Sequence, residues 1–332
     1  MSYMNHPSKR AIRDNWCRPL IRFIREQLGH KLTYLGLPSP EAHDILCWLE
    51  HIDHIIAFQC RDFPAPSSVA QTKDEILKLE GKLLELERQG QIDSFSLYDG
   101  YIEEVLLKGK DTIGKPYAQE RMVTVYNLDF CNGITVPLCY YDENQNRHEA
   151  YKSDAIKRLL EFQTSVASRT GSAKFVMFLT VHSNFFPDEQ KRFLEQEQNA
   201  ELRRYLARID QLPRVERNLR TLKTYIYQML TSFFRTAQFS PEFLPPIYYQ
   251  GATSRGRPNW LVHFTVVGAY NRNPSSIAPC LQSTTTFLNE KFLEIRNNRF
   301  CSMTTPGVSE NNARNSSVAA FQNSSIFGQL WR

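Results

Sequence analysis

Residues 31–58 read KLTYLGLPSPEAHDILCWLEHIDHIIAF. This stretch begins with an apolar run at 31–37, turns at 38–40, continues in a helical pattern at 41–51 and ends in a second apolar run at 53–58. Short apolar runs bounded by proline or polar residues are typical of strands. A strand, a helix and a strand in so short a stretch predict a parallel βαβ unit, whose crossover is right-handed in nearly all proteins.

The same alternation continues toward the C-terminus. Further strands are predicted at 94–98, 122–128 and 174–181, with helices around 76–86, 101–108 and 152–168 between them. Repeated βα units of this kind predict an α/β fold with a doubly wound, mainly parallel sheet of about seven strands. Apolar runs at 244–250 and 260–268, separated by a turn-forming stretch, predict a closing antiparallel hairpin.

Four further segments are predicted around this core. Residues 1–30 contain a basic amphipathic helix, which Pro19 kinks or divides. Residues 187–235 form a helical insertion with a narrow apolar seam, inside a Rossmann-like domain of residues 31–270. Residues 271–300 are expected to be a helical extension. Residues 301–332, rich in serine and asparagine, are expected to be a disordered tail.

Composition narrows the class of protein. A hydrophobic content of 42% is that of an ordinary globular chain. The seven cysteines are an odd number without a C-x-x-C motif, which favours free thiols in a reducing compartment. No apolar run is long enough to span a bilayer, so the sequence predicts a cytoplasmic protein with no membrane contact. A net charge of +5 does not by itself indicate a nucleic-acid-binding protein.

Five parallel βα units followed by an antiparallel hairpin resemble the class I S-adenosylmethionine-dependent methyltransferases over about residues 31–268. The resemblance lies in the order of the elements. It implies a Rossmann-like fold, S-adenosylmethionine as the cofactor, and a site at the carboxyl ends of the parallel strands.

The resemblance implies cofactor contacts at the first three strand ends. The first carries Tyr34 and a single Gly36, where the family usually has several glycines beneath the cofactor. The second ends at Gln59, where the family usually has an acid that binds the ribose. At the third, Asp99 is similar to the family's acid beside the adenine, and Tyr98 offers a ring to cover the base. Each end can also be interpreted as a simple turn or helix cap.

The resemblance places the methyl acceptor at the fourth strand end. The segment Asn127-Leu128-Asp129-Phe130 is similar to the N/D-P-P-Y/F motif of amino-methyltransferases, but it lacks both prolines. It implies that Asn127 holds the acceptor, that Asp129 orients or deprotonates it, and that Phe130 stacks on it. The alternative is a tight turn followed by a buried thiol at Cys131. Histidines and a cysteine at 43–54 are interpreted as packing residues, and no metal site is predicted.

Two functions remain open from the sequence. The first is a divergent methyltransferase that acts on nucleic acid or another large substrate. The second is a catalytically inactive methyltransferase-like binding module in a multi-protein assembly, for example in bacterial defence. Arg214, Arg217 and Arg220, together with the N-terminal helix, are the predicted contacts to nucleic acid, and a protein partner is the other possibility.

Overall fold

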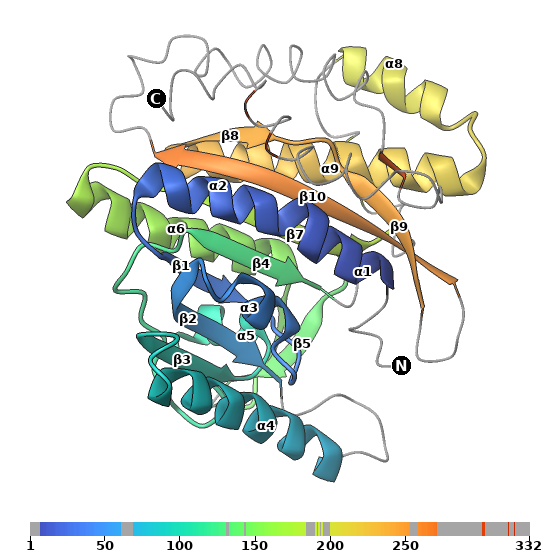
Figure 1. Ribbon diagram of the computed structural model, residues 1–332. Coiled ribbons are helices and arrows are strands. Elements are labelled where there is room, and N and C mark those ends of the chain that lie inside the picture. Colours follow the sequence, from blue (N-terminus) through green and yellow to red (C-terminus); the bar gives the residue numbers. More distant parts are fainter. Residues whose placement is uncertain are drawn as a thin grey trace.

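A computed structural model describes residues 7–60, 69–130, 133–142, 144–183, 200–252 and 258–270, with the separate residues 190, 192, 194, 301, 302, 318 and 322. Figure 1 shows a twisted sheet with helices packed on both of its faces. The predicted extension at 271–300 and nearly all of the predicted tail at 301–332 lie outside the described residues.

The main sheet has the order β11-β9-β10-β7-β4-β1-β2-β3, and β8 also pairs with β10. The strands β1, β2, β3, β4 and β7 run parallel, while β10 is antiparallel to β7, β8 and β9. Their bounds are β1 Leu32–Gly36, β2 Ile52–Gln59, β3 Ser94–Asp99, β4 Val125–Asp129, β7 Lys174–His182, β8 Phe239–Phe243, β9 Ile247–Ala252, β10 Pro258–Tyr270 and β11 Cys301–Ser302. The predicted doubly wound, mainly parallel α/β sheet and the closing antiparallel hairpin are confirmed.

The described part of the sheet has nine strands, whereas about seven were predicted. One addition is β8, which precedes the predicted hairpin. It is separated from β9 by Pro245 and Pro246, and proline cannot donate a hydrogen bond to a neighbouring strand. The other is the two-residue β11, within the segment that was expected to be a disordered tail.

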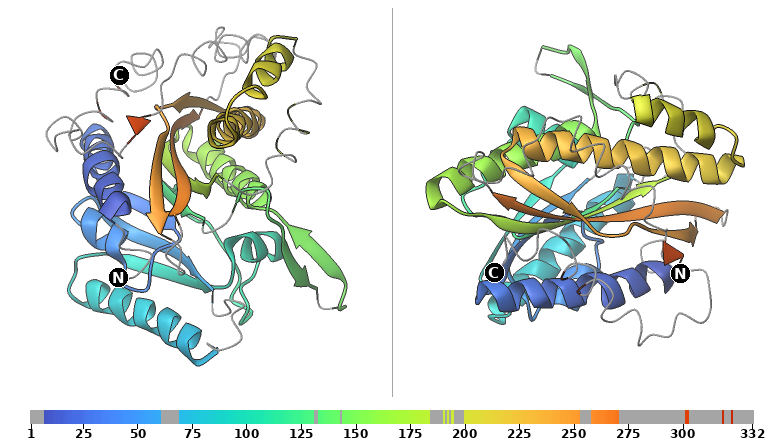
Figure 2. Two further views of the ribbon diagram at one scale, coloured as in Figure 1. Left: turned by 90° about the vertical axis from the view of Figure 1, so that its right-hand side faces the viewer. Right: turned by 90° about the horizontal axis from the view of Figure 1, so that it is seen from above.

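Two layers of helices bury the sheet. One face, here called the α2 face, is covered by α1 (Pro7–Ile12), α2 (Arg18–Leu28), α3 (His43–Trp48) and α4 (Val69–Arg88). The other, the α9 face, is covered by α5 (Ile102–Lys108), α6 (Lys152–Thr170), α8 (Ala200–Ile209) and α9 (Arg214–Thr236). Seen from above, the sheet lies between α2 and α9 (Figure 2). Burial on both faces explains why β7 is apolar along its length.

Residues 7–28 form the N-terminal arm. Its first and last parts are the helices α1 and α2, and Arg13–Cys17 between them is a π-helical turn. This wider turn stands directly before Pro19, which cannot donate a backbone hydrogen bond to the preceding turn. The helix is therefore not divided at Pro19: its backbone stays helical over residues 7–28, and the irregular turn lies on the N-terminal side of the proline. Ile12, Leu20, Ile21 and Ile24 face the sheet.

The described helices of the insertion are α8 and α9, but the predicted narrow apolar seam is wrong. In α9 the residues 218–231 are buried almost without interruption, including Lys223 and Gln228. A helix that packs against the sheet and against both α6 and α8 is buried around most of its circumference. The apolar periodicity of the sequence predicts the helix, but it does not show how many other elements pack against that helix.

A second, two-stranded sheet was not predicted. β5 (Leu138–Tyr141) and β6 (Arg147–Ala150) form a hairpin that packs on α5 and projects from the body (Figure 2). Its turn is fixed by the Asp142 carboxylate, which accepts hydrogen bonds from the backbone amides of Asn144 and Asn146 at 2.9 and 2.8 Å. The run of Asp, Asn and Gln residues at 142–146 is the signal that predicts such a turn.

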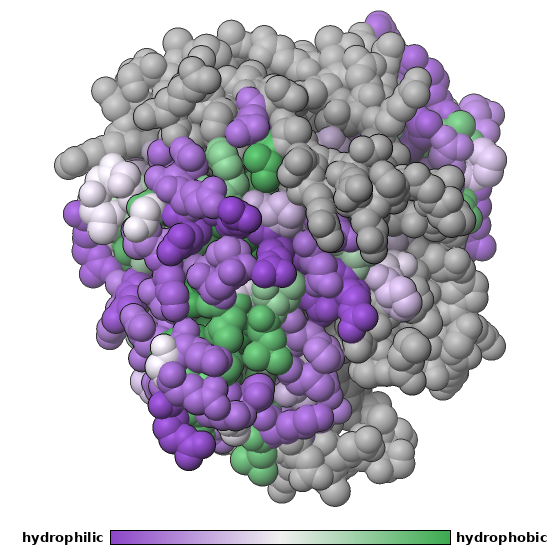
Figure 3. Space-filling view, in the orientation of Figure 1, coloured by the Kyte–Doolittle hydropathy of each residue, from purple (hydrophilic) through white to green (hydrophobic). Residues whose placement is uncertain are grey.

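The face shown in Figure 3 is mainly hydrophilic, with an apolar area over α3 and α4. Leu46 of α3 and Leu84 of α4 are exposed on these helices. Among the described residues, no helix combines the length and the hydropathy that a membrane crossing requires.

Candidate site at the carboxyl ends of the parallel strands

The predicted site residues stand at the carboxyl edge of the sheet in adjacent registers. Gly36 lies beside Asn127 of β4, and Gln59 lies beside Asp99 of β3. Side chains alternate along a strand, so Gln59, Asp99, Asn127 and Asp129 all emerge on the α2 face. The structure therefore brings the predicted polar residues of β2, β3 and β4 to one edge and one face.

Tyr98 and Phe130 point to the opposite face. The Tyr98 ring stacks on Phe58 with the centroids 5.4 Å apart, within the core of the α9 face. Phe130 is buried in the same core, with the Lys152 ammonium 5.7 Å from the centre of its ring. Neither ring can cover a ligand that Asp99 or Asp129 contacts. Cys131, the thiol of the alternative interpretation, lies outside the described residues.

A buried polar network closes the end of β1. The Tyr34 hydroxyl donates to the Asp44 carboxylate of α3 at 2.5 Å, and the Asn127 amide donates to the same oxygen at 2.6 Å. Burial and the charge of Asp44 raise the pKa of Tyr34 well above its ordinary value. The phenol is therefore a permanent donor that holds β1, β4 and α3 together.

Gly36 is required by this network. A Cβ atom at this position would meet the Tyr34 hydroxyl and would lie 2.7 Å from the backbone oxygen of Asn127. The Tyr34 ring thus extends over Gly36, in the direction of the strand end. The space above the single glycine of this turn is therefore filled by the Tyr34 ring of the same chain.

Tyr34→Phe is expected to lower the free energy of unfolding by about 1–2 kcal/mol, because it removes one buried charge-assisted hydrogen bond and keeps the ring. Urea unfolding measures the change. Tyr141→Phe is the matched control, since Tyr141 is 58% exposed on the β5–β6 hairpin. An unchanged midpoint for Tyr34→Phe would show that the hydroxyl does not stabilise the fold.

The N-terminal arm reaches the same edge. The Lys9 ammonium of α1 lies 2.5 Å from the Asp129 carboxylate, although the two residues are 120 positions apart. The Lys9 side chain is 9% exposed and that of Asp129 is 22% exposed. The carboxylate that the sequence assigned to the acceptor is therefore ion-paired within the chain.

Further along the arm, two buried contacts join it to β10. The Trp16 indole donates to the Thr265 hydroxyl at 2.9 Å, and the Cys17 thiol lies 3.6 Å from the His263 ring. The other ring nitrogen of His263 lies 2.9 Å from the Thr180 hydroxyl. Burial lowers the pKa of His263 to about 4 and raises that of Cys17 well above its ordinary value. These groups are neutral near pH 7, and the thiol is not a nucleophile there.

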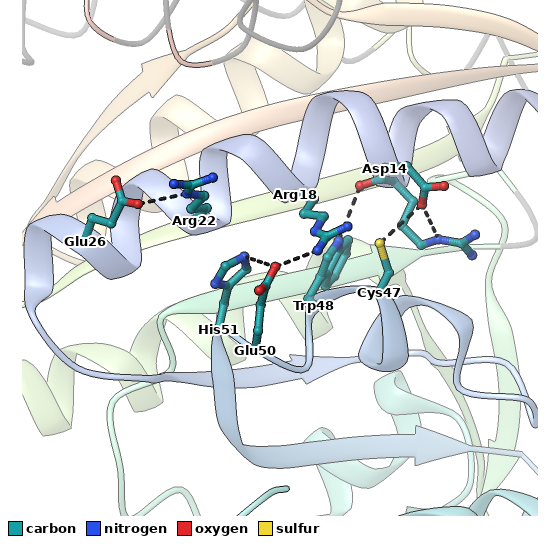
Figure 4. Close-up of polar contacts among 9 residues, drawn as sticks. Asp14, Arg18, Arg22, Glu26, Cys47, Trp48, Glu50 and His51 are labelled. Atoms are coloured by element: carbon teal, nitrogen blue, oxygen red, sulfur yellow. Dashed lines mark hydrogen bonds and ion pairs between the residues drawn. The ribbon is translucent and has the colours of Figure 1, made fainter. Parts of the chain in front are cut away.

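Further contacts join the arm to α3 and to Glu50, which follows that helix (Figure 4). Arg18 donates to Glu50 at 2.6 Å, the Cys47 thiol donates to Asp14 at 3.2 Å, and the Trp48 indole donates to the backbone oxygen of Arg13 at 3.3 Å. Cys47, which the sequence analysis interprets as a packing residue, here contacts a carboxylate of the arm. Among the described residues, no group of three or more His, Cys, Asp or Glu side chains is placed to hold a metal ion.

Between the arm, α3 and the strand ends lies a crevice of about 70 Å³. Its polar lining includes the side chains of Lys9, Ser39, Asp44, Asn127, Asp129 and His263. A volume of this size holds a few water molecules, whereas pockets for drug-sized ligands measure about 300–1,000 Å³. The enclosed part of the crevice therefore does not hold a nucleoside-containing cofactor in this arrangement.

The residues present do not fit S-adenosylmethionine in this arrangement. The Tyr34 ring takes the space over Gly36, and the Lys9–Asp129 pair spans the place predicted for the acceptor. Gln59 and Asp99 are side by side, but Asp99 is only 2% exposed. The polar edge at β2 and β3 keeps an amide and a carboxylate, Gln59 and Asp99, which are groups that can bind a nucleoside.

Sequence reasoning missed three residues of this site. Lys9 was assigned to a basic helix, although its partner is 120 positions away. Asp44 stands in the first turn of α3, where an acid is ordinary. His263 had a visible signal, since it interrupts the apolar strand LVHFTVV at 261–267. A polar residue inside a buried strand predicts a specific hydrogen-bond partner.

A family model described as PP_RS20740-like matches residues 5–229, and the chain belongs to this family. No curated protein matches the chain. Among solved structures it is similar to EvdMO1, with 12% identity and a TM-score of 0.30, covering 75% of this chain and 39% of that protein. YcgJ of Bacillus subtilis matches with 9% identity and a TM-score of 0.33, covering 76% of this chain and 98% of that protein. A protein of Agrobacterium tumefaciens, titled a SAM-dependent methyltransferase, matches with 9% identity and a TM-score of 0.28. The match covers 76% of this chain and 60% of that protein. Scores this low carry no conclusion about the ligand or activity of this chain.

Proposed function

We propose that this member of the PP_RS20740-like family is a binding module built on a methyltransferase-like fold, whose cofactor site is closed by its own side chains. The observation that carries the proposal is the Tyr34 ring over Gly36, fixed by Asp44. The methyltransferases that the order of elements resembles usually keep several glycines at this strand end. The Lys9–Asp129 pair closes the neighbouring strand end in the same way.

Opening this site costs free energy. A ligand over Gly36 must displace the Tyr34 hydroxyl from Asp44, and a buried polar group left without its partner costs about 1–3 kcal/mol. A ligand at Asp129 must also separate a largely buried ion pair. Both costs subtract from any affinity for S-adenosylmethionine.

The test is calorimetric titration of S-adenosylmethionine into the wild type, Lys9→Met and Asp99→Asn. We expect all three to bind more weakly than about 1 mM, which corresponds to about −4 kcal/mol. A radiolabelled transfer assay on nucleic acid and on protein is expected to show no methyl transfer. Micromolar binding by the wild type that is lost in Asp99→Asn would contradict the proposal.

A methyltransferase that opens when the arm moves is the second candidate. It is favoured by the Ser39 hydroxyl, which is 6% exposed, lines the crevice and has no hydrogen-bond partner among the described residues. A ligand atom would satisfy it. This candidate requires that Lys9→Met bind S-adenosylmethionine at least about 10-fold more tightly than the wild type. It also requires that Asp129→Asn reduce turnover about 100-fold, as loss of an acceptor-orienting group does.

A further inference from the structure

The helices α8 and α9 form a hairpin with an unusual distribution of charge. α8 packs inward through Leu202, Tyr205, Leu206 and Ile209, which are all buried. Its outer side presents Arg203, Arg204, Ala207 and Arg208, which are all exposed. Over residues 202–209 the inner side of α8 is therefore apolar, and three of the four exposed residues are arginines.

The basic side continues across the turn into α9. Residues 203–220 contain six arginines and only two carboxylates, Asp210 and Glu216. Glu216 is occupied within the helix, because it accepts from both Nε and Nη2 of Arg220 at 3.0 and 2.6 Å. Arg220 is thus neutralised locally, which removes it from the predicted contacts. The α8–α9 basic surface consists of Arg203, Arg208, Arg214 and Arg217.

The two helices are held in a fixed relation. The Tyr205 hydroxyl of α8 forms side-chain hydrogen bonds with Thr224 and Arg220 of α9. Arg203, Arg208 and Arg214 are therefore presented from a packed scaffold. Binding through preorganised groups costs less ordering entropy than binding through a free segment.

This surface is separate from the other basic part of the chain. The N-terminal arm covers the α2 face of the sheet, whereas α8 and α9 cover the α9 face (Figure 2). In the N-terminal arm, the exposed Arg18 and Arg22 each form an ion pair with a glutamate, Glu50 and Glu26 respectively. The arm and the insertion, which the sequence combined into one nucleic-acid contact, therefore present their arginines from opposite faces of the sheet.

We propose that the α8–α9 basic surface binds the phosphate backbone of a nucleic-acid duplex. This inference rests on the proposed function, since it names the partner of the binding module. Guanidinium groups match phosphate with two parallel hydrogen bonds, so a row of arginines favours phosphate over isolated carboxylates. Single strands also require aromatic rings on which bases stack, and residues 203–217 expose no aromatic side chain. Membrane binding requires large apolar side chains beside the charges, and the exposed apolar residues within 203–217 are only Ala207, Pro213 and Val215.

The experiment measures the affinity of the full chain for a short mixed-sequence DNA duplex over a range of salt concentrations. Each phosphate contact contributes about −0.9 to the slope of log K against log salt. We expect micromolar affinity near physiological salt. Arg203→Ala with Arg208→Ala is expected to reduce the magnitude of the slope by about 2 and to weaken low-salt binding at least about 10-fold.

Arg22→Ala with Arg25→Ala is the matched control, because it removes the same charge from the other face of the sheet. We expect its slope to equal that of the wild type. Equal losses in both double variants, absence of duplex binding, or binding to vesicles of anionic phospholipid instead of the duplex would each overturn the proposal. Methyl transfer would refute the closed cofactor site and leave this result unchanged, so the two proposals fail separately.

Discussion

Asp129→Ala is expected to lower the free energy of unfolding by about 3 kcal/mol. The substitution removes the carboxylate that lies 2.5 Å from the Lys9 ammonium, and the Lys9 side chain is only 9% exposed. Removing one member of a buried ion pair typically costs about 3–5 kcal/mol, because the other charge stays away from water. Asp129 is partly exposed, which places the expected value at the lower end. Urea unfolding followed by circular dichroism measures it.

The reverse substitution is expected to cost less. Lys9→Met leaves the charge on Asp129, whose side chain is 22% exposed and better hydrated, so we expect a loss of about 1 kcal/mol. The double variant Lys9→Met with Asp129→Leu is expected to recover most of the stability lost in Asp129→Ala, since it replaces both charges by apolar groups. Equal losses in the two single variants, without coupling in the double one, would show that the arm is not held by this pair.

Between pH 6.5 and 4, His263 is expected to reduce the free energy of unfolding by about 3 kcal/mol. Its pKa is about 4 in the folded protein, because burial disfavours the charged ring, against an ordinary value of 6.5. Above pH 6.5 the ring is neutral in both states and contributes no pH dependence. As the pH falls below 6.5, the ring takes up a proton in the unfolded chain but stays neutral in the folded protein. The free energy of unfolding therefore falls by about 1.4 kcal/mol per pH unit.

Nearby charges act on the same ring in opposite directions. Asp129 raises the pKa of His263 and Lys9 lowers it, while Thr180 and Cys17 contact its nitrogens. Unfolding curves from pH 7 to 4 test the prediction. His263→Gln is expected to flatten the pH dependence by the contribution of one proton, whereas His30→Gln, an exposed control at the end of α2, is expected to keep it. A His263→Gln variant with the full wild-type pH dependence would assign the effect to another group, of which His182 is the first to examine.

The parallel core was predictable because its signals are local. Each of β1, β2 and β7 is a short apolar run, and the helices between them show the spacing of one buried side. The hairpin of β9 and β10 was also visible, since a turn-forming stretch separates two apolar runs. What was missed depends on neighbours that are distant in the sequence. The nearly complete burial of α9 is one example, and the ion pair between Lys9 and Asp129 is another.

The sequence predicts which strand ends carry the polar residues of the candidate site, but only partly to which face of the sheet the side chains point. Asp99 and Asp129 reach the carboxyl edge of the sheet as expected. Tyr98 and Phe130 were assigned to the same site as their neighbours, but adjacent residues of a strand point to opposite faces. The alternation of the strands was already available from the sequence and excludes both rings. The closure by Tyr34 was not predictable, because the sequence does not show that its ring lies over Gly36.

The bond between Trp16 and Thr265 has a consequence for the order of events on the ribosome. The two residues are 249 positions apart, so the N-terminal arm is synthesised long before the strand on which it rests. At translation rates of about 5–20 residues per second, the interval is roughly 10–50 s. During that time the apolar side of the emerging helix, with Leu20, Ile21 and Ile24, has no β10 to cover it. A nascent chain of this protein therefore offers chaperones a hydrophobic helix near its start, and it finishes folding only after β10 has left the exit tunnel.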